Sequence, residues 1–276
     1  MSAAPSLPIE IVRPDFPRGD FRAALFDFDG TLSLLRGSWQ PLMIDMMVDL
    51  LATLPRAESR DTLRPLVTSF VQQLTGGPTI DQMRRLVAEM VQRGGNPRTA
   101  EHYREQYLDL LNQAIAGRLT ALAAGEKTLE ELTVPGAAGL LEQLHARGIA
   151  LWLASGTNHD CVVRELRVLG LNGWFDECVF GDVPPPAVFS KAGVIQQMLR
   201  QHELAGGQFL GIGDGFVEIA ETVRAGGLAI GVASNEQTRT GVDAEKRRWL
   251  IEAGAHIIIG DYRQSRELLQ IIGLDA

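Results

Sequence analysis

The chain has 276 residues, of which 45% are hydrophobic and 22% are charged, and these are ordinary proportions for a globular protein. A length above the usual size of one domain predicts a core domain together with a smaller second one. The formal net charge of −8 argues against a nucleic-acid partner, because phosphate backbones attract clustered lysine and arginine.

The first predicted segment is an N-terminal arm, residues 1–20. The arm is rich in proline and Glu10 interrupts its short apolar run, so it does not resemble a signal peptide. No uninterrupted apolar run of about 18 residues occurs in the chain, so no membrane-spanning helix is predicted. Cys161 and Cys178 are expected to be reduced thiols rather than a disulfide framework. We therefore expect a cytoplasmic protein with no membrane partner.

The next element is a short apolar strand, Arg22–Phe28, after which the pattern changes to helical spacing. Four apolar stripes at this spacing follow, beginning at Trp39, Leu63, Met83 and Tyr103. Turns that contain glycine and proline separate them, at Thr75–Pro78 and Gly94–Pro97. We predict that residues 38–131 form an inserted, all-helical cap domain.

From residue 132 onward, strands and helices alternate. The predicted strands are Ile149–Ala154, Glu177–Phe180, Phe209–Ile212, Leu228–Val232 and His256–Ile259. The predicted helices are Pro135–Arg147, Asn158–Leu169, Ser190–Leu204, Val217–Ala225, Ala244–Ala253 and Gln264–Ile271. This alternation predicts an α/β fold, a Rossmann-like parallel sheet covered by helices on both faces. Residues 21–37 and 132–276 are assigned to this core, where ligands bind beyond the carboxyl ends of the strands.

Polar side chains follow the predicted strands. The first strand ends in Asp27-Phe28-Asp29-Gly30-Thr31, the second in Ser155-Gly156-Thr157, and the strand Phe209–Ile212 in Gly213-Asp214-Gly215, with Glu218 soon after. Lys191 lies at the start of a helix. In an extended segment Asp27 and Asp29 point to the same side, so both carboxylates can face one substrate.

These motifs, in this order, resemble those of the haloacid dehalogenase superfamily: DxDGT, a serine or threonine, a lysine, and an acidic Gly-Asp motif. The helical insert is similar to the cap of phosphoglycolate-phosphatase and β-phosphoglucomutase-like members. The resemblance extends from about Arg22 to Gly273. One departure concerns the lysine, which many members place before a proline. Here Pro184-Pro185-Pro186 has no lysine, and Phe189-Ser190-Lys191 matches the other arrangement.

The resemblance implies roles for the acidic residues. Asp27 would be the nucleophile that forms an acyl phosphate, and Asp29 would protonate the leaving oxygen and then deprotonate water. The like charges of Asp27, Asp29, Asp214 and Glu218 would raise the pKa values of these carboxyl groups unless a cation joins them, and Mg²⁺ suits hard oxygen ligands. By resemblance, its ligands would be the Asp27 carboxylate, the Asp29 backbone carbonyl and Asp214. Glu218 would act behind these ligands or through a water, or it could simply cap its helix. Thr31 could hold the Asp29 side chain.

Three groups are candidates for binding the phosphate. Ser155 offers a hydroxyl, and the turn at Gly156 offers backbone N–H groups. Lys191 is expected to balance the charge of the phosphate and of the nucleophile. The alternative for Lys191 is a solvated surface lysine.

Substrate selection is assigned to the cap and the hinge, because the core recognises only the phosphate. The candidate residues for contacts with the leaving group are Arg36, Trp39, Thr75 and Gln82. Trp39 could instead only anchor the first cap helix. Neutral polar groups of this kind suit hydroxyls, so a sugar phosphate or a similar small phosphomonoester is expected.

The expected function is a Mg²⁺-dependent phosphatase that acts on a small phosphorylated molecule as a monomer or homodimer. A phosphomutase of the β-phosphoglucomutase type needs the same residues and stays an alternative. A non-catalytic binding protein with this fold is a third possibility, which the presence of Asp27, Asp29, Lys191 and Asp214 argues against.

Overall fold

The computed structural model describes residues 9–37, 39–75, 77–183 and 189–274, so Ser38, Gly76 and Pro184–Pro186 lie outside the described residues. Within these ranges, one sheet contains seven strands in the order β1-β7-β6-β5-β2-β3-β4. They are β1 Glu10–Ile11, β2 Ala23–Phe26, β3 Ala150–Asn158, β4 Val179–Asp182, β5 Phe209–Gly213, β6 Leu228–Val232 and β7 Ile257–Ile259. Neighbouring strands are parallel, except that β1 is antiparallel to β7. The predicted parallel α/β core is confirmed.

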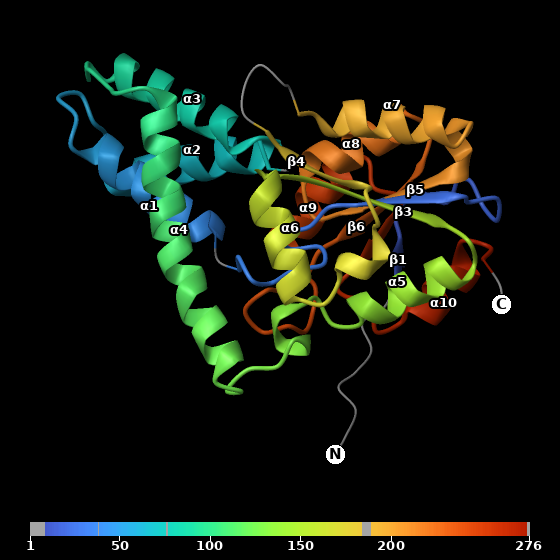
Figure 1. Cartoon of the computed structure of the whole chain (residues 1–276). Helices are drawn as coiled ribbons and strands as arrows, with labels where there is room; N and C mark the ends of the chain where they lie inside the picture. The colour runs from blue at the N-terminus through green and yellow to red at the C-terminus, as the bar shows by residue number, and fades with distance from the viewer. Residues whose placement is uncertain (1–8, 38, 76, 184–188, 275–276) are drawn as a thin grey trace.

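Helices cover both faces of the sheet (Figure 1). One face carries α5 Ala137–Ala146, α6 His159–Val168 and α10 Ser265–Ile271, and the other carries α7 Lys191–Gln201, α8 Phe216–Arg224 and α9 Ala244–Glu252. Strand β2 illustrates the cause: Ala24 and Phe26 join the apolar cluster on the α5 face, whereas Ala23 and Leu25 join the cluster on the α7 face. Both faces are therefore apolar, as in a buried parallel strand.

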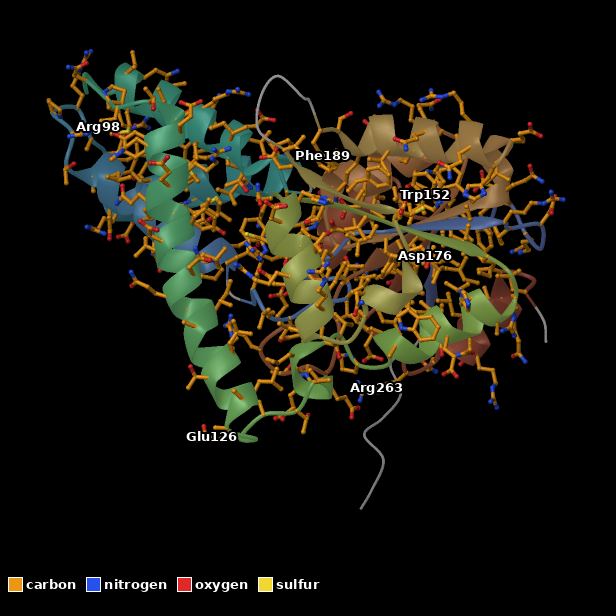
Figure 2. All side chains as sticks on the ribbon, in the orientation of Figure 1. Arg98, Glu126, Trp152, Asp176, Phe189 and Arg263 are labelled. Carbon is orange, nitrogen blue, oxygen red and sulfur yellow. The ribbon has the colours of Figure 1, made fainter. Side chains whose placement is uncertain are left out.

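Close packing fixes the position of β3, which carries Ser155. Trp152 of β3 is fully buried (labelled in Figure 2). It stacks on Phe180 with ring centroids 5.3 Å apart. Its Nε1 donates a hydrogen bond to His202 Nε2 at 3.1 Å. Three short 3-10 helices in the described ranges complete the connections, η1 Glu130–Leu132, η2 Asn172–Trp174 and η3 Gly206–Gln208.

Four helices between β2 and β3 lie together at one side of the sheet (Figure 1). They are α1 Trp39–Ala52, α2 Arg60–Gln73, α3 Thr79–Gln92 and α4 Ala100–Ala123. Their predicted apolar stripes are buried in one cluster that includes Met43, Leu63, Met83 and Tyr103. The prediction of four helices in this insert is confirmed. No helix in the described part of the chain combines the length and the apolarity needed to cross a bilayer.

The predicted N-terminal arm is in part a strand of the sheet. In β1, Glu10 lies opposite Ile258 of β7, and Arg247 Nε donates a hydrogen bond to Glu10 Oε2 at 2.7 Å. Arg13 Nη1 donates to the carbonyl of Gly254 at 3.1 Å, and Phe16 is buried. This strand was not predicted, because two residues are too few to carry a periodic pattern.

Candidate active site

The carboxyl ends of β2, β3 and β5 meet at one cavity of about 60 Å³. Asp27 directly follows β2, and its backbone N–H donates a hydrogen bond to the carbonyl of Ile212 in β5 at 2.9 Å. The parallel pairing of these two strands therefore places Asp27 beside Asp214. The cavity lining contributed by the strand ends, called here the strand-end side, comprises Asp27, Asp29, Ser155, Gly156, Thr157 and Asp214.

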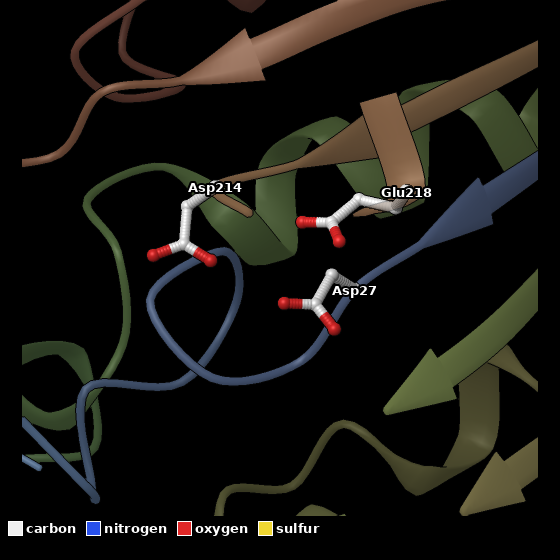
Figure 3. A group of neighbouring side chains, drawn as sticks. All are labelled: Asp27, Asp214 and Glu218. Atoms are coloured by element: carbon white, nitrogen blue, oxygen red, sulfur yellow. The ribbon is translucent and has the colours of Figure 1, made fainter. Parts of the chain in front are cut away.

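Three buried carboxylates, those of Asp27, Asp214 and Glu218, have oxygen atoms within 4.8 Å of one another. Figure 3 shows that they approach a common space from the end of β2, the end of β5 and the start of α8. Burial raises the pKa of Asp27 and of Asp214, and the Glu218 carboxylate adds to both shifts. Nearby ammonium groups oppose these shifts. Nearby cations therefore favour the ionised form of these carboxyl groups.

Lys191 supplies one of these cations. Its Nζ donates hydrogen bonds to Asp27 Oδ1 at 2.6 Å and to Glu218 Oε2 at 2.9 Å. Ser190 caps α7 by accepting a hydrogen bond from Gly193 N–H, and this cap makes Lys191 the first residue of the helix. Burial disfavours the ammonium, but Asp27 and Glu218 raise the pKa of Lys191 overall. The side chain is 1% exposed, so the alternative of a surface lysine was wrong.

Glu218 combines both of the roles considered for it. The backbone N–H of Gly215 donates a hydrogen bond to Glu218 Oε1, which caps α8, and Lys191 binds the other oxygen. Each carboxylate oxygen thus already accepts a hydrogen bond. This arrangement favours a role in holding Lys191 over direct binding of a metal.

Asp29 is held by Thr157 rather than by Thr31. Thr157 Oγ1 donates a hydrogen bond to Asp29 Oδ2 at 2.8 Å, whereas the buried Thr31 hydroxyl has no partner among the described residues. The expectation for Thr31 was wrong, because β3 continues through Ser155–Thr157 with an irregular register and carries Thr157 to Asp29. Burial raises the pKa of Asp29 to about 7, with Arg36 opposing the shift. A carboxyl with such a pKa can both donate and accept a proton near neutral pH.

Lys246 is a part of the site that was not predicted from the sequence. Its Nζ donates hydrogen bonds to Asp214 Oδ2 and to Glu236 Oε1, both at 2.7 Å. The residue is 6% exposed and lies in the first turn of α9. The motifs of the resemblance do not include this position. The sequence offered one signal for Lys246: acidic residues are in excess at the strand ends, and the only other lysines of the chain are Lys127 and Lys191.

The four predicted specificity residues all line the same cavity. Three of them, Trp39, Thr75 and Gln82, belong to the insert. Tyr107 of α4, which was not predicted, lines the cavity beside them. We call Trp39, Thr75, Gln82 and Tyr107 the cap side. Thr75 Oγ1 donates to the carbonyl of Val71 at 2.9 Å and accepts from Gln40 Nε2 at 3.3 Å. Tyr107 is buried as a residue and lines the cavity, and its hydroxyl makes no hydrogen bond with a described residue.

Arg36 lines the cavity, but another residue holds its side chain. Its Nε and Nη2 donate hydrogen bonds to Glu165 of α6 at 3.0 and 2.6 Å, and its Nε lies 3.7 Å from Asp29 Oδ1. Such a bidentate pair fixes the plane of the guanidinium. The structure thus places Arg36 against the acid–base candidate, and Glu165 explains why it cannot swing freely toward a leaving group.

The loop that joins α2 to α3 covers the site. The carbonyl of Thr75 accepts a hydrogen bond from Val217 N–H in α8 at 3.4 Å. A Cβ atom at Gly156 would lie 2.2 Å from the carbonyl oxygen of Gly77, so only glycine permits this approach. The insert and the predicted phosphate-binding turn are therefore in direct contact, which describes a closed site.

The residues of the cluster fit a divalent cation bound through oxygen. Asp27 and Asp214 each keep one carboxylate oxygen that accepts no hydrogen bond from the described residues. Asp29 Oδ1 is also buried, and no described residue donates a hydrogen bond to it. The carboxylates outnumber Lys191 and Lys246, which leaves negative charge for a cation to balance. Mg²⁺ is commonly bound by one or two carboxylates together with water and substrate oxygens.

Solved structures with a similar fold include three that cover nearly the whole chain. A predicted phosphoglycolate phosphatase from Haemophilus somnus 129PT is 18% identical, with a TM-score of 0.55 over 91% of this chain and 99% of that one. The β-phosphoglucomutase of Clostridium difficile is 17% identical, with a TM-score of 0.59 over 91% and 96%. A phosphonoacetaldehyde hydrolase-like protein from Oleispira antarctica is 14% identical, with a TM-score of 0.61 over 93% and 94%. At these identities the likeness concerns the fold.

The sequence comparisons identify the family. No curated protein matches the chain. Residues 21–226 match the haloacid dehalogenase-like hydrolase family, a range that holds Asp27, Asp29, Ser155, Lys191 and Asp214. This match spans well over half of the sequence. The chain therefore belongs to the haloacid dehalogenase-like hydrolase family.

Proposed function

We propose that the protein is a Mg²⁺-dependent phosphatase that hydrolyses a small phosphomonoester through a phosphoaspartate at Asp27. The observation that carries this proposal is the contact of Asp27 with Lys191, buried at the end of β2 and facing a cavity that Asp29 shares. Hydrolysis of a phosphomonoester needs a nucleophile, a proton donor for the leaving oxygen and positive charge around the phosphate. Asp27, Asp29 and Lys191 offer one of each.

In the first step, a carboxylate oxygen of Asp27 forms a bond to phosphorus while the bond from phosphorus to the leaving oxygen breaks. Asp29 donates its proton to that oxygen, so an alcohol leaves. The pKa of about 7 for Asp29, which burial produces, keeps a large protonated fraction at neutral pH. Lys191 and the hydroxyl of Ser155 stabilise the phosphate oxygens on which charge builds.

In the second step, water attacks phosphorus, and the bond to Asp27 breaks. Asp29, now ionised, accepts a proton from the water, which restores both carboxyl groups and releases phosphate. Asp27, Asp214 and the backbone carbonyl of Asp29 would hold Mg²⁺, which would neutralise the charge of the phosphate and the carboxylates when bound.

The cap side supports a neutral, hydroxyl-bearing leaving group such as that of a sugar phosphate. Trp39, Thr75, Gln82 and Tyr107 offer an indole, hydroxyls and an amide but no charge. Among the described lining residues Arg36 is the one cation, and Glu165 and Asp29 already balance it. The contact between Gly77 and Gly156 supports closure of the insert over the bound substrate, which excludes bulk water.

A screen of small phosphomonoesters tests the proposal. Inorganic phosphate should be released in the presence of Mg²⁺, and excess chelator should stop the release. Full activity in chelator would contradict the metal requirement. Analysis of the remaining sugar distinguishes the second candidate, because a phosphomutase returns an isomeric sugar phosphate instead of free phosphate.

A further inference from the structure

A group of side chains that the proposed reaction does not use contacts Asp214. Lys246 is its centre, with Nζ hydrogen bonds of 2.7 Å to Asp214 Oδ2 and to Glu236 Oε1. The indole Nε1 of Trp249, one helical turn further along α9, donates to the Asp214 carbonyl at 3.3 Å. Both ends of Asp214, its carboxylate and its backbone, are therefore held by α9.

The same group is connected to the turn after β2. Lys246 Nζ donates a hydrogen bond to Ser234 Oγ at 3.4 Å, and Ser234 Oγ donates to the carbonyl of Gly30 at 2.8 Å. A Cβ at Gly30 would lie 2.1 Å from Asp214 Oδ2, so glycine is needed for the approach of Asp214. Asp243 caps α9 by accepting hydrogen bonds from the N–H groups of Glu245 and Lys246. The position of Lys246 is thus fixed by the backbone as well as by its ion pairs.

These contacts distribute the carboxylate oxygens of the cluster unevenly. Lys246 occupies Oδ2 of Asp214, which leaves Oδ1 as the oxygen without a hydrogen bond from a described residue. Lys191 likewise occupies Oδ1 of Asp27, and both oxygens of Glu218 accept hydrogen bonds. Each potential metal-binding aspartate therefore presents one free oxygen rather than two.

We propose that Lys246 is a positioning residue that restricts Asp214 to one metal-binding oxygen and so makes the site selective for Mg²⁺ over Ca²⁺. Mg²⁺ requires near-octahedral geometry with oxygens at about 2.0–2.1 Å, whereas Ca²⁺ accepts bidentate carboxylates and six to eight oxygens at about 2.3–2.6 Å. A carboxylate held by a lysine through one oxygen suits the first pattern. This inference rests on the proposed function in assuming that the cluster binds Mg²⁺.

The test is a pair of binding measurements on the folded protein, with Mg²⁺ and with Ca²⁺ in isothermal titration calorimetry. In Lys246→Met, Asp214 can turn both oxygens toward the ion, so Ca²⁺ affinity should rise relative to Mg²⁺ affinity by about tenfold. Lys246→Arg keeps a donor at the same place and should largely keep the wild-type ratio. Lys127→Met removes the same charge far from the cluster and should change neither affinity.

Lys246→Met also makes the site more negative, and a more negative site binds both ions more tightly. The double variant Lys246→Met/Glu236→Gln removes one charge of each sign, and it should show the same shift in the ratio of affinities. The double variant also carries the test if the single one does not fold, since it leaves fewer unbalanced buried charges. Circular dichroism establishes folding in each case.

Two results would overturn the inference in different ways. A Lys246→Met protein whose affinities for both ions change by the same factor, or do not change, would show that Lys246 contributes only charge or structure. A wild-type protein that binds no Mg²⁺ would instead contradict the metal requirement of the proposed function, and the inference with it.

Discussion

The two sides of the cavity differ in charge. The strand-end side contains carboxylates, and Lys191 binds one oxygen of Asp27 while Lys246 binds one oxygen of Asp214, so these two aspartate side chains are charged and held in place. The cap side has only neutral groups, and the Tyr107 hydroxyl has no hydrogen-bond partner among the described residues. A charged, preorganised surface suits the phosphate, whereas an uncharged, partly polar surface suits the variable part of a substrate. The proposed function accordingly assigns the chemistry to the strand-end side and substrate recognition to the cap side.

Removing the nucleophile should have the largest effect on the strand-end side. Asp27→Asn keeps the shape of the side chain but removes the attacking oxygen anion, so kcat should fall by at least about a thousandfold. The same change at Asp45, which is exposed on α1, is the matched control and should leave kcat unchanged. Residual activity of more than a few per cent in Asp27→Asn would contradict the role of Asp27.

A pair of threonines gives a smaller and more specific effect. Thr157→Val removes the hydroxyl that donates to Asp29 and should lower kcat by about tenfold, because Asp29 loses a group that orients it. Thr31→Val makes the same replacement at a buried hydroxyl without a partner, and both its activity and its thermal stability should match or exceed the wild type. Equal losses of activity in the two variants would contradict the assignment of Thr157.

On the cap side, Tyr107→Phe should lower kcat/KM by about fivefold for substrates with a hydroxylated leaving group, the value of one neutral hydrogen bond. Methyl phosphate has no such hydroxyl, so its kcat/KM should stay the same. Kinetics of both substrates with both proteins measure the difference. A loss of equal size for methyl phosphate would place Tyr107 in the chemistry rather than in recognition.

The buried acid should also affect stability as a function of pH. Because burial raises the pKa of Asp29 to about 7, the folded metal-free protein binds more protons than the unfolded chain between the ordinary carboxyl pKa and about 7. Its stability should therefore decrease as pH rises through this range. Thermal melts in chelator should show a decrease of a few degrees that is smaller in Asp29→Asn. An identical pH dependence in the two proteins would contradict this account.

The parts of the fold that local patterns encode were predictable. The apolar run that ends at Asp27 and the stripe that includes Met83 lie within single elements, so the spacing of side chains is enough to place them. The two-residue strand β1 was not predictable, since its pairing with β7 connects positions about 250 residues apart.

The residues of the site likewise include some that the sequence could place and some that it could not. Asp27, Asp29, Ser155 and Asp214 could be placed because strand ends of a parallel sheet meet at one edge. Partners set by tertiary contacts could not: Glu165 holds Arg36 across 129 positions and Thr157 holds Asp29 across 128. Thr31 was favoured only by its nearness in sequence. Lys246 reaches Asp214 through a helix whose orientation no local pattern specifies.

The central claim is that the phosphoryl group passes through Asp27. Rapid acid quenching during turnover, followed by mass spectrometry of the proteolysed protein, measures this directly. The account predicts that in the wild type one phosphoryl group is found on Asp27 and on no other acidic residue. In Asp27→Asn, the corresponding peptide should carry no phosphoryl group. Turnover in which no phosphorylated peptide forms at the earliest quench times, or in which another residue carries the group, would contradict it.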